Sequence, residues 1–491
     1  MLLLGGALRL LAAIFSQGFL ASDDHHVVIT AADQIASGAG LPATYARSAL
    51  LPGAIAAIMT VGRTLGIHDP GIEMLLVRLV QAAYSLLVVY FVYRILAGAS
   101  PHDSLSRTGE GERQSRGGGA VIGGLLAAVF FAMPVTAVHQ LEESVCQVPL
   151  LAAFYWWQRG ETAVSPQRSA IWGAVAGVML GVALILRFPL IGLVGAFVAL
   201  ALLRARPVTL TAKLALLAGL LLVVVLQGYS NALINHEWWY SFKARLGPML
   251  HPQQMALESE GYPHSPPWHY LLTLLAALIP PASVLLLAAA VKGGAARPFL
   301  LPGVGALAFL VSHSLIANKQ ERFLLPILPV LFILIVAGLP WLASRLGRWY
   351  RAMWWYFWAV NTALLLAVTF SFSKKDRVAP LVYVYRRHDA TGVLIAQFDQ
   401  SFTVPDYYLG RPRPLMTILR RPDEAVDTGS RINYVVLYSD TPDIDRAVLA
   451  NTLGQNLILL KTITPSLTDR IAHAINPRHN KARTARIYTT T

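Results

Sequence analysis

Long apolar runs recur through this chain, and they constrain its fold more than any other feature. Leu210 to Gln227 and Phe323 to Leu339 are two examples. Such runs approach the roughly 20 residues that a helix needs to cross a bilayer core about 30 Å thick. We therefore predict an all-α polytopic membrane protein with about eleven transmembrane helices, centred near residues 11, 85, 129, 152, 178, 195, 219, 280, 308, 331 and 362.

The composition agrees with a membrane protein. Charged residues make up 13% of the chain, against roughly 25% in an ordinary soluble domain. The net charge of +14 does not indicate nucleic acid, because the basic residues punctuate the apolar runs instead of clustering. Cys146 is the single cysteine, so no intrachain disulfide can form. The first apolar block, Leu2 to Leu20, lacks a small-residue cleavage signal and is expected to be retained.

The basic residues predict the topology through the positive-inside rule. With a cytoplasmic N-terminus, residues 21–73, residues 229–267 and everything after residue 373 lie on the opposite face. These segments are rich in aspartate and histidine, which simple connectors do not require. The cytoplasmic turns then hold Arg107, Arg113, Arg116, Arg159, Arg168, Arg204, Arg206, Lys292, Arg297, Arg345, Arg348 and Arg351.

The chain changes character near residue 373. Mixed polar sequence follows, with β-like runs at Val393 to Phe398 and Ile432 to Tyr438 and a turn signal at Thr441-Pro442-Asp443. We predict a transmembrane domain over residues 1–372 and a small non-cytoplasmic α/β domain over residues 373–491.

The strongest local signal is Asp23-Asp24-His25-His26, directly after the first apolar run. It places carboxylates at the boundary between membrane and water. A solvated turn that ends a helix would look the same, so position alone does not assign a function.

A second signal is the charged stretch from Asn318 to Pro326, wedged between two apolar runs. Lys319 and Arg322 are three residues apart, so on a helical turn they share a face and could bind one anion. The alternative is a pair of snorkelling side chains at the membrane boundary. The predicted topology puts this stretch outside, where basic anchors are disfavoured.

Two further motifs lie near the ends of apolar runs. Arg187-Phe188-Pro189 predicts a break in the chain, with an arginine that is costly to expose to lipid and should face the bundle interior. The alternative is that this arginine forms a structural ion pair. Pro266-Pro267-Trp268-His269-Tyr270 opens the eighth predicted span, and taken alone it is an aromatic belt.

Together these motifs resemble the polyprenyl-phosphate-sugar-dependent glycosyltransferases of the GT-C fold, above all glycosyltransferase family 22, the mannosyltransferases of GPI-anchor and N-glycan assembly. The family's acidic pair is similar to Asp23-Asp24. Its later motifs, in the same order, resemble Arg47 to Pro52, Arg187 to Pro189, Pro267 to Tyr270 and Asn318 to Pro326. The resemblance covers roughly residues 1–372.

Three positions depart from the family pattern. Asn318 replaces its histidine, Gln320 its glutamate in the late motif and Asp24 its glutamate in the acidic pair. The donor sugar is therefore open, and a distant bacterial member is indicated.

The resemblance implies an inverting transfer of a sugar, mannose above all, from a polyprenyl-phosphate donor to a glycan or lipid-linked acceptor. Asp23 would be the base, with Asp24 orienting the acceptor or the base. Neither a metal nor a cofactor is expected. The cations for the donor phosphate would be Lys319 and Arg322, then Arg47 and Arg187, and the substrate pocket would include His25, Trp268 and His269.

The expected place is a bacterial inner membrane, with the site facing the periplasm, or the endoplasmic reticulum in a eukaryote. Two other functions stay open. One is an enzyme of the same fold that transfers another lipid-linked sugar, such as an arabinose- or glucose-type residue, to lipid A, a glycan or protein. The other is a transporter or flippase of lipid-linked glycans, against which the lack of an internal repeat in the sequence argues.

Overall fold

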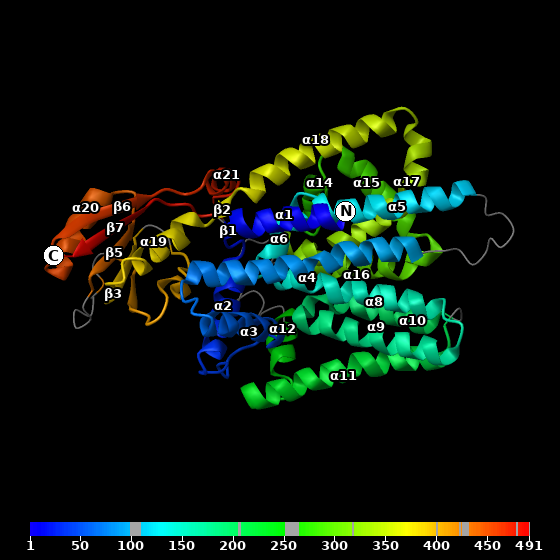
Figure 1. Cartoon of the computed structure of the whole chain (residues 1–491), viewed down its shortest axis with the longest axis horizontal. Helices are drawn as coiled ribbons and strands as arrows, with labels where there is room; N and C mark the ends of the chain where they lie inside the picture. The colour runs from blue at the N-terminus through cyan, green and yellow to red at the C-terminus, as the bar shows by residue number, and fades with distance from the viewer. Residues whose placement is uncertain are drawn as a thin grey trace.

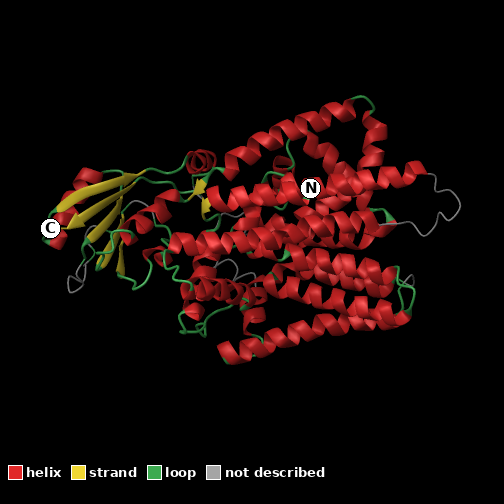
Figure 2. Ribbon diagram, in the orientation of Figure 1, coloured by secondary structure: helices red, strands yellow, loops and turns green. Residues whose placement is uncertain are grey.

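The computed structural model describes residues 1–98, 110–204, 208–250, 265–316, 319–398, 401–421, 424, 432–477 and 480–490, without the side chains of residues 23, 24, 110–117 and 246–250. Most of this part is helical, and a small sheet follows near the C-terminus (Figure 2). Several residues of the sequence analysis lie outside the described residues or side chains: Asp23, Asp24, Arg107, Arg113, Arg116, Arg206 and Asn318.

Six helices of the described part are long and apolar enough to cross a membrane, and two bent pairs raise the number to eight. The bent pairs are α5 (Glu110–Val129) with α6 (Ala132–Val138) and α14 (His269–Ala277) with α15 (Ala282–Gly294). The long helices are α4 (Pro70–Gly98), α9 (Pro166–Leu186), α11 (Leu210–Asn235), α16 (Leu300–Leu315) with η2 (Arg297–Phe299), α17 (Leu328–Leu346) with η3 (Glu321–Ile327), and α18 (Trp349–Thr369).

The predicted number of eleven spans is therefore not confirmed, although a many-spanning architecture is. The other three expected centres fall in α1 (Leu2–Phe15), α8 (Gln147–Glu161) and α10 (Ile191–Leu203), which follows η1 (Phe188–Leu190). These helices have 14, 15 and 13 residues. They are shorter than the 17 to 25 residues, roughly, of a typical transmembrane helix.

The segment after the first span is helical and not an open loop. It forms α2 (Ser22–Ala36) and α3 (Leu50–Thr64), and the later segment contains α12 (Tyr240–Leu250). Val28, Ile29 and Ala32 are buried at helical spacing, so α2 packs one apolar face against the bundle. The backbone of Asp23 and Asp24 lies in the first turn of this helix.

The two ends of the helical bundle differ. Figure 1 shows α2, α3, α12 and the C-terminal sheet at one end. The ends of α8, α10 and α17 and the starts of α9, α11 and α18 lie at the other end. Arg168 lies in the first turn of α9, Arg204 directly follows α10, and Arg348 directly precedes α18. The long segments and the basic turns are thus separated as the charge pattern predicts. Which end faces the cytoplasm stays a prediction.

The C-terminal part contains a five-stranded sheet in the order β4-β3-β5-β7-β6. Strand β3 is parallel to β4 and β5, whereas β7 is antiparallel to β5 and β6. The two predicted β-like runs are confirmed as β3 and β5. The elements are α19 (Lys375–Tyr385), β3 (Gly392–Gln397), η4 (Asp406–Leu409), β4 (Leu415–Leu419), β5 (Tyr434–Tyr438), α20 (Pro442–Leu453), β6 (Leu457–Ile463), α21 (Leu467–Ile475) and β7 (Ala485–Thr490).

A short pair of parallel strands joins the two ends of the transmembrane part. Strand β1 (Gln17–Gly18), after α1, pairs with β2 (Phe372–Ser373), after α18. Gly18 has φ +77°, and a Cβ atom there would collide with the carbonyl oxygen of Ser373, so only glycine fits. The predicted domain boundary at residues 372 and 373 falls inside this pairing and stays a prediction.

Candidate functional site

A cavity of about 750 Å³ lies where the sheet end of the bundle meets α19. Its apolar wall includes Phe130, Leu274 and Leu328. Among the described lining residues, four side chains are basic and one is a carboxylate, so the cavity is electropositive. The charged residues are Lys319, Arg322, Lys374, Arg377 and Glu321.

The two cations of the late motif line this cavity together. Lys319 is 5% exposed, and its ammonium donates a hydrogen bond of 2.9 Å to the carbonyl oxygen of Ser265. Burial lowers the pKa of the Lys319 amine. Arg322 lies in η3, and the Gln147 amide fixes that turn by donating to the carbonyl oxygen of Leu325 at 2.7 Å.

A buried acidic pair on α7 (Glu142–Val145) collects the arginines that the motifs singled out. The guanidinium of Arg47 lies 3.2 Å from the Glu142 carboxylate. Arg187 lies 3.8 Å from Glu142 and 3.0 Å from Glu143, and Arg322 lies 3.7 Å from Glu143. Arg47 and Arg187 are not among the residues that line the cavity. Their contacts are ion pairs behind its wall, and a role in phosphate binding stays a prediction.

The N-terminus of α2 opens on the same cavity. Ala21 and Ser22, which directly precede Asp23, are lining residues. The Ser22 hydroxyl accepts a hydrogen bond of 3.2 Å from Arg377 of α19. The backbone of the acidic pair therefore starts at the cavity wall.

Lys374 and Arg377 form a wall of the cavity that sequence reasoning missed. Burial and the charge of Arg377 lower the pKa of the Lys374 amine, although Asp469 and Asp376 oppose the shift. Arg377 is 4% exposed and stacks on Phe402, 4.6 Å from the ring centroid. Asp376, whose pKa is raised by burial, accepts from the backbone amide of Arg483. No motif of the sequence analysis includes these residues, which lie at the start of α19 after the last span.

The three predicted substrate-binding residues lie in three different environments. His269 lines the cavity. Trp268 is 61% exposed and is not among the lining residues. His25 is buried between Phe19 and Tyr408, with ring centroids at 4.9 and 5.8 Å, and it bonds Gln140 at 3.0 Å. Burial lowers the pKa of His25 to about 4.

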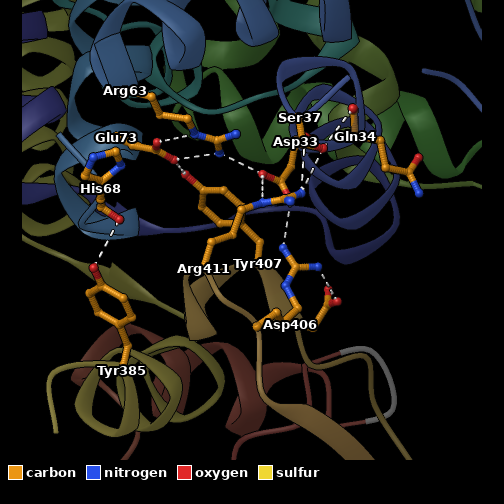
Figure 3. A network of polar contacts seen from close by, with 11 residues as sticks. Asp33, Gln34, Ser37, Arg63, His68, Glu73, Tyr385, Asp406, Tyr407 and Arg411 are labelled. Carbon is orange, nitrogen blue, oxygen red and sulfur yellow. Dashed lines mark hydrogen bonds and ion pairs between the residues drawn. The ribbon is translucent and has the colours of Figure 1, made fainter. Parts of the chain in front are cut away.

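A network of ion pairs holds α2 from the other side (Figure 3). The buried Asp33 carboxylate contacts Arg63 of α3 at 2.7 Å, and Arg411 and Arg413 at 2.8 and 2.7 Å. Burial raises the pKa of this carboxyl, but hydrogen bonds from Arg411 and Arg63 outweigh it and hold the pKa below 3.8. Because Arg411 and Arg413 follow η4, the network ties the catalytic candidate helix to the C-terminal part.

Within the described residues, no group of three or more His, Cys, Asp or Glu side chains is placed to hold a metal ion. The expectation of a metal-free site stays a prediction, since the carboxylates of Asp23 and Asp24 are outside the described side chains.

Comparisons with known proteins agree with this architecture. Residues 1–395 match the sequence profile of the Alg9-like mannosyltransferase family. A crystal structure of ArnT from Cupriavidus metallidurans bound to undecaprenyl phosphate is similar with a TM-score of 0.59 and 14% identity, covering 99% of this chain and 97% of that chain. The apo structure of the same protein is similar with a TM-score of 0.61 and 16% identity, covering 98% of this chain and 96% of that chain. None of the curated proteins matches the sequence.

The likeness to ArnT confirms the expected fold, a GT-C-type helical membrane bundle with a small C-terminal sheet.

Proposed function

Because the chain belongs to the Alg9-like mannosyltransferase family of glycosyltransferases, we propose that it transfers mannose from a polyprenyl-phosphate donor to a glycan or lipid-linked acceptor. The observation that carries this proposal is the electropositive cavity, in which Lys319 and Arg322 lie beside the N-terminus of α2. A phosphate leaving group needs cations, and the acceptor hydroxyl needs a base. The related fold of ArnT, bound to undecaprenyl phosphate, supports the choice of donor.

The cavity suits an amphiphilic donor. Its apolar wall, with Phe130 and Leu328, would accommodate the first prenyl units. Lys319 and Arg322 would hold the phosphate, Arg322 through two parallel hydrogen bonds that a guanidinium can donate. The charge that grows on the departing phosphate would then be stabilised where water is partly excluded.

Asp23 would take the proton of the acceptor hydroxyl while that oxygen attacks the anomeric carbon. The bond from this carbon to the phosphate oxygen breaks on the opposite face, and the anomeric configuration inverts. Asp24 would orient the acceptor or the base, and His269 would line the sugar site. Glu143 would restrain Arg322 from behind through their ion pair. We place this reaction on the non-cytoplasmic face, since the basic turns lie at the opposite end.

The test uses the full-length protein in lipid nanodiscs with radiolabelled polyprenyl-phosphate mannose and extracted acceptor glycolipids. We expect transfer, and we expect Asp23→Asn to lower it by about 10²- to 10⁴-fold because a general base contributes that much. Asp443→Asn is the matched control, an exposed aspartate in the first turn of α20. Turnover by Asp23→Asn equal to that of the control removes Asp23 from the mechanism.

The same assay examines the cations. Lys319→Ala and Arg322→Ala are expected to raise the KM for the donor more than the KM for the acceptor. Lys243→Ala in α12, whose side chain is 69% exposed, should leave both unchanged. Unaltered donor kinetics in both cavity variants would contradict phosphate binding there.

A second candidate is the transfer of a different lipid-linked sugar by the same chemistry. The observation that favours it is the match with ArnT over almost the full chain, the C-terminal sheet included, whereas the family match ends at residue 395. Offering other radiolabelled polyprenyl-phosphate sugars to the same nanodiscs decides between the two.

A further inference from the structure

A second cavity, of about 620 Å³, lies on the other side of α19. It is bounded by the end of α1, the start of α4, α19 and β6. None of its lining residues lines the first cavity. Lys374, which directly precedes α19, and Arg377 line the first cavity, and Lys375 and Val378 line the second.

Arg78 is the unusual residue of this cavity. It is 6% exposed, and its Nε atom is fully buried without a hydrogen-bond partner. Among the described residues, no hydrogen bond or ion pair of the Arg78 side chain is found. A buried guanidinium without a counter-ion is costly, so a site of this kind is suited to an anion from outside the chain.

The other charges around the cavity have the same sign. Lys375, Arg386 and Lys461 line it, and no aspartate or glutamate is among its described lining residues. Arg386 lies 3.5 Å from Asp69, and the Lys461 ammonium lies 4.9 Å from the Tyr383 ring centroid. The cavity therefore concentrates positive charge around the buried Arg78.

Part of the remaining lining is apolar and reaches the exposed surface of the bundle. Ile14 of α1 and Ile72 of α4 are 39% and 47% exposed, and both line the cavity. Met74 and Leu75 continue this wall along α4. A hydrocarbon chain can therefore leave the cavity along these two helices while a charged group stays beside Arg78.

We propose that this second cavity binds the anionic, phosphate-bearing headgroup of a membrane lipid, with Arg78 as the buried counter-ion. Lys375 and Lys461 attract the headgroup at the rim, and the lipid tail lies between α1 and α4. The ligand is either a bilayer phospholipid or a second polyprenyl phosphate, since both carry the same phosphate chemistry. The proposed lipid site does not depend on glycosyl transfer in the first cavity.

The test is native mass spectrometry of the delipidated full-length protein, titrated with phosphatidylglycerol, undecaprenyl phosphate and, as a zwitterionic reference, phosphatidylcholine. We expect the second cavity to provide one tight site for an anionic lipid, in addition to any binding in the first cavity, and we expect Arg78→Gln to weaken that site about tenfold or more, because hydrogen bonds between charged groups are lost. Loss of phosphatidylglycerol binding assigns the site to bilayer phospholipid. If Arg78→Gln loses binding of undecaprenyl phosphate alone, the site belongs to a polyprenyl phosphate.

Two controls separate this site from other effects. Arg94→Gln removes a positive charge from the far end of the same helix, where Arg94 bonds Tyr90 and Tyr155, and should bind lipid as the unaltered protein does. Lys319→Ala alters the first cavity and should leave the second site intact.

A rim variant keeps the proposal testable if Arg78→Gln fails to fold. Lys375→Gln with Lys461→Gln changes only partly exposed or exposed side chains and should weaken binding of the same lipid several-fold. Wild-type binding of all three lipids by the rim variant, and by Arg78→Gln where it folds, overturns the proposal.

Discussion

At the scale of single residues, two glutamates organise the arginines behind the candidate site. Glu142 and Glu143 are 6% and 0% exposed, and they contact Arg47, Arg187 and Arg322. The three arginines come from segments far apart in the sequence. Their convergence fixes η3, and with it one wall of the cavity, through charge pairing in a place from which water is largely excluded.

This pairing leads to a prediction for Glu143→Gln. The variant removes the carboxylate that pairs with Arg187 and Arg322, and breaking a buried ion pair costs about 3 to 5 kcal/mol. We expect a clear decrease in the thermal unfolding temperature, measured in detergent. Glu237→Gln is the control, because the pair of Glu237 with Lys243 is exposed and such pairs contribute only about 0 to 1 kcal/mol. Equal unfolding temperatures would contradict the structural role of Glu143.

A second prediction at this scale concerns His25 and pH. Its folded-state pKa of about 4 lies below the usual 6.5, so between these values the unfolded chain binds a proton that the folded chain does not. The stabilising contribution is full above pH 6.5 and is lost as the pH falls toward 4. His25→Phe keeps the stack with Phe19 and Tyr408 but cannot titrate.

The measurement is the unfolding temperature at pH 7.5 and pH 5. Between pH 7.5 and pH 5, the unfolding temperature should fall less in His25→Phe than in the unaltered protein. In His388→Asn, which changes an exposed histidine, it should fall as much as in the unaltered protein. An identical decrease in His25→Phe would show that His25 does not cause it.

At the scale of elements, helices α9 and α11 pack through glycines. Gly173, Gly177 and Gly181 recur every four residues on α9, and a Cβ atom at Gly177 would collide with the carbonyl oxygen of Leu216 on α11. Small residues at this spacing let membrane helices approach closely, which compensates for the absence of a hydrophobic driving force in lipid.

We therefore predict that Gly177→Ala lowers the unfolding temperature, although alanine is the better helix former. Gly195→Ala on α10 is the matched control, because nothing lies within 4 Å of a Cβ atom there. It should be neutral or stabilising. A stabilised Gly177→Ala would show that the two helices can separate at little cost.

Much of the helical pattern could be predicted from the sequence, because lipid requires long apolar segments. The centres predicted near residues 85, 178, 219 and 331 fall inside long helices. The centre near residue 280 falls at a bend of 110°, which hydropathy cannot reveal. Helix α2 was not predicted, because its polar face of aspartate and histidine hides the buried Val28, Ile29 and Ala32.

At the scale of the whole molecule, the C-terminal part is bound to the bundle through the network around Asp33. Arg63, Arg411 and Arg413 share this one carboxylate, and Tyr407 donates to Glu73 at 2.8 Å (Figure 3). Because the folded-state pKa of Asp33 lies below 3.8, the network is charged near neutral pH and is lost only in acid.

Asp33→Asn is expected to loosen this attachment. Hydrogen exchange of backbone amides in α2 and β4 should become about tenfold faster, since local opening becomes easier. Transfer activity should decrease because α2 carries Asp23. Gln34→Ala is the control on the same helix, as the side chain of Gln34 points away from the arginines (Figure 3). Exchange rates equal to those of the control would contradict the coupling.

The candidate site could be predicted only in part. Lys319, Arg322 and His269 do lie on one cavity, because all three belong to motifs at span ends that the bundle brings together. Lys374 and Arg377 could not be foreseen. Their place depends on how the C-terminal part folds back on the bundle, and no sequence periodicity encodes that docking.

The pairing of β1 with β2 also sets an order in time. The second strand leaves the ribosome about 350 residues after the first, which at about 5 to 20 residues per second means a delay of roughly 20 to 70 s. Arg377, which donates a hydrogen bond to the Ser22 hydroxyl, is synthesised after both strands. The acidic pair is therefore synthesised long before Lys374 and Arg377, and the cavity is completed only when synthesis is nearly finished, because Asn476 and Asn480 also line it.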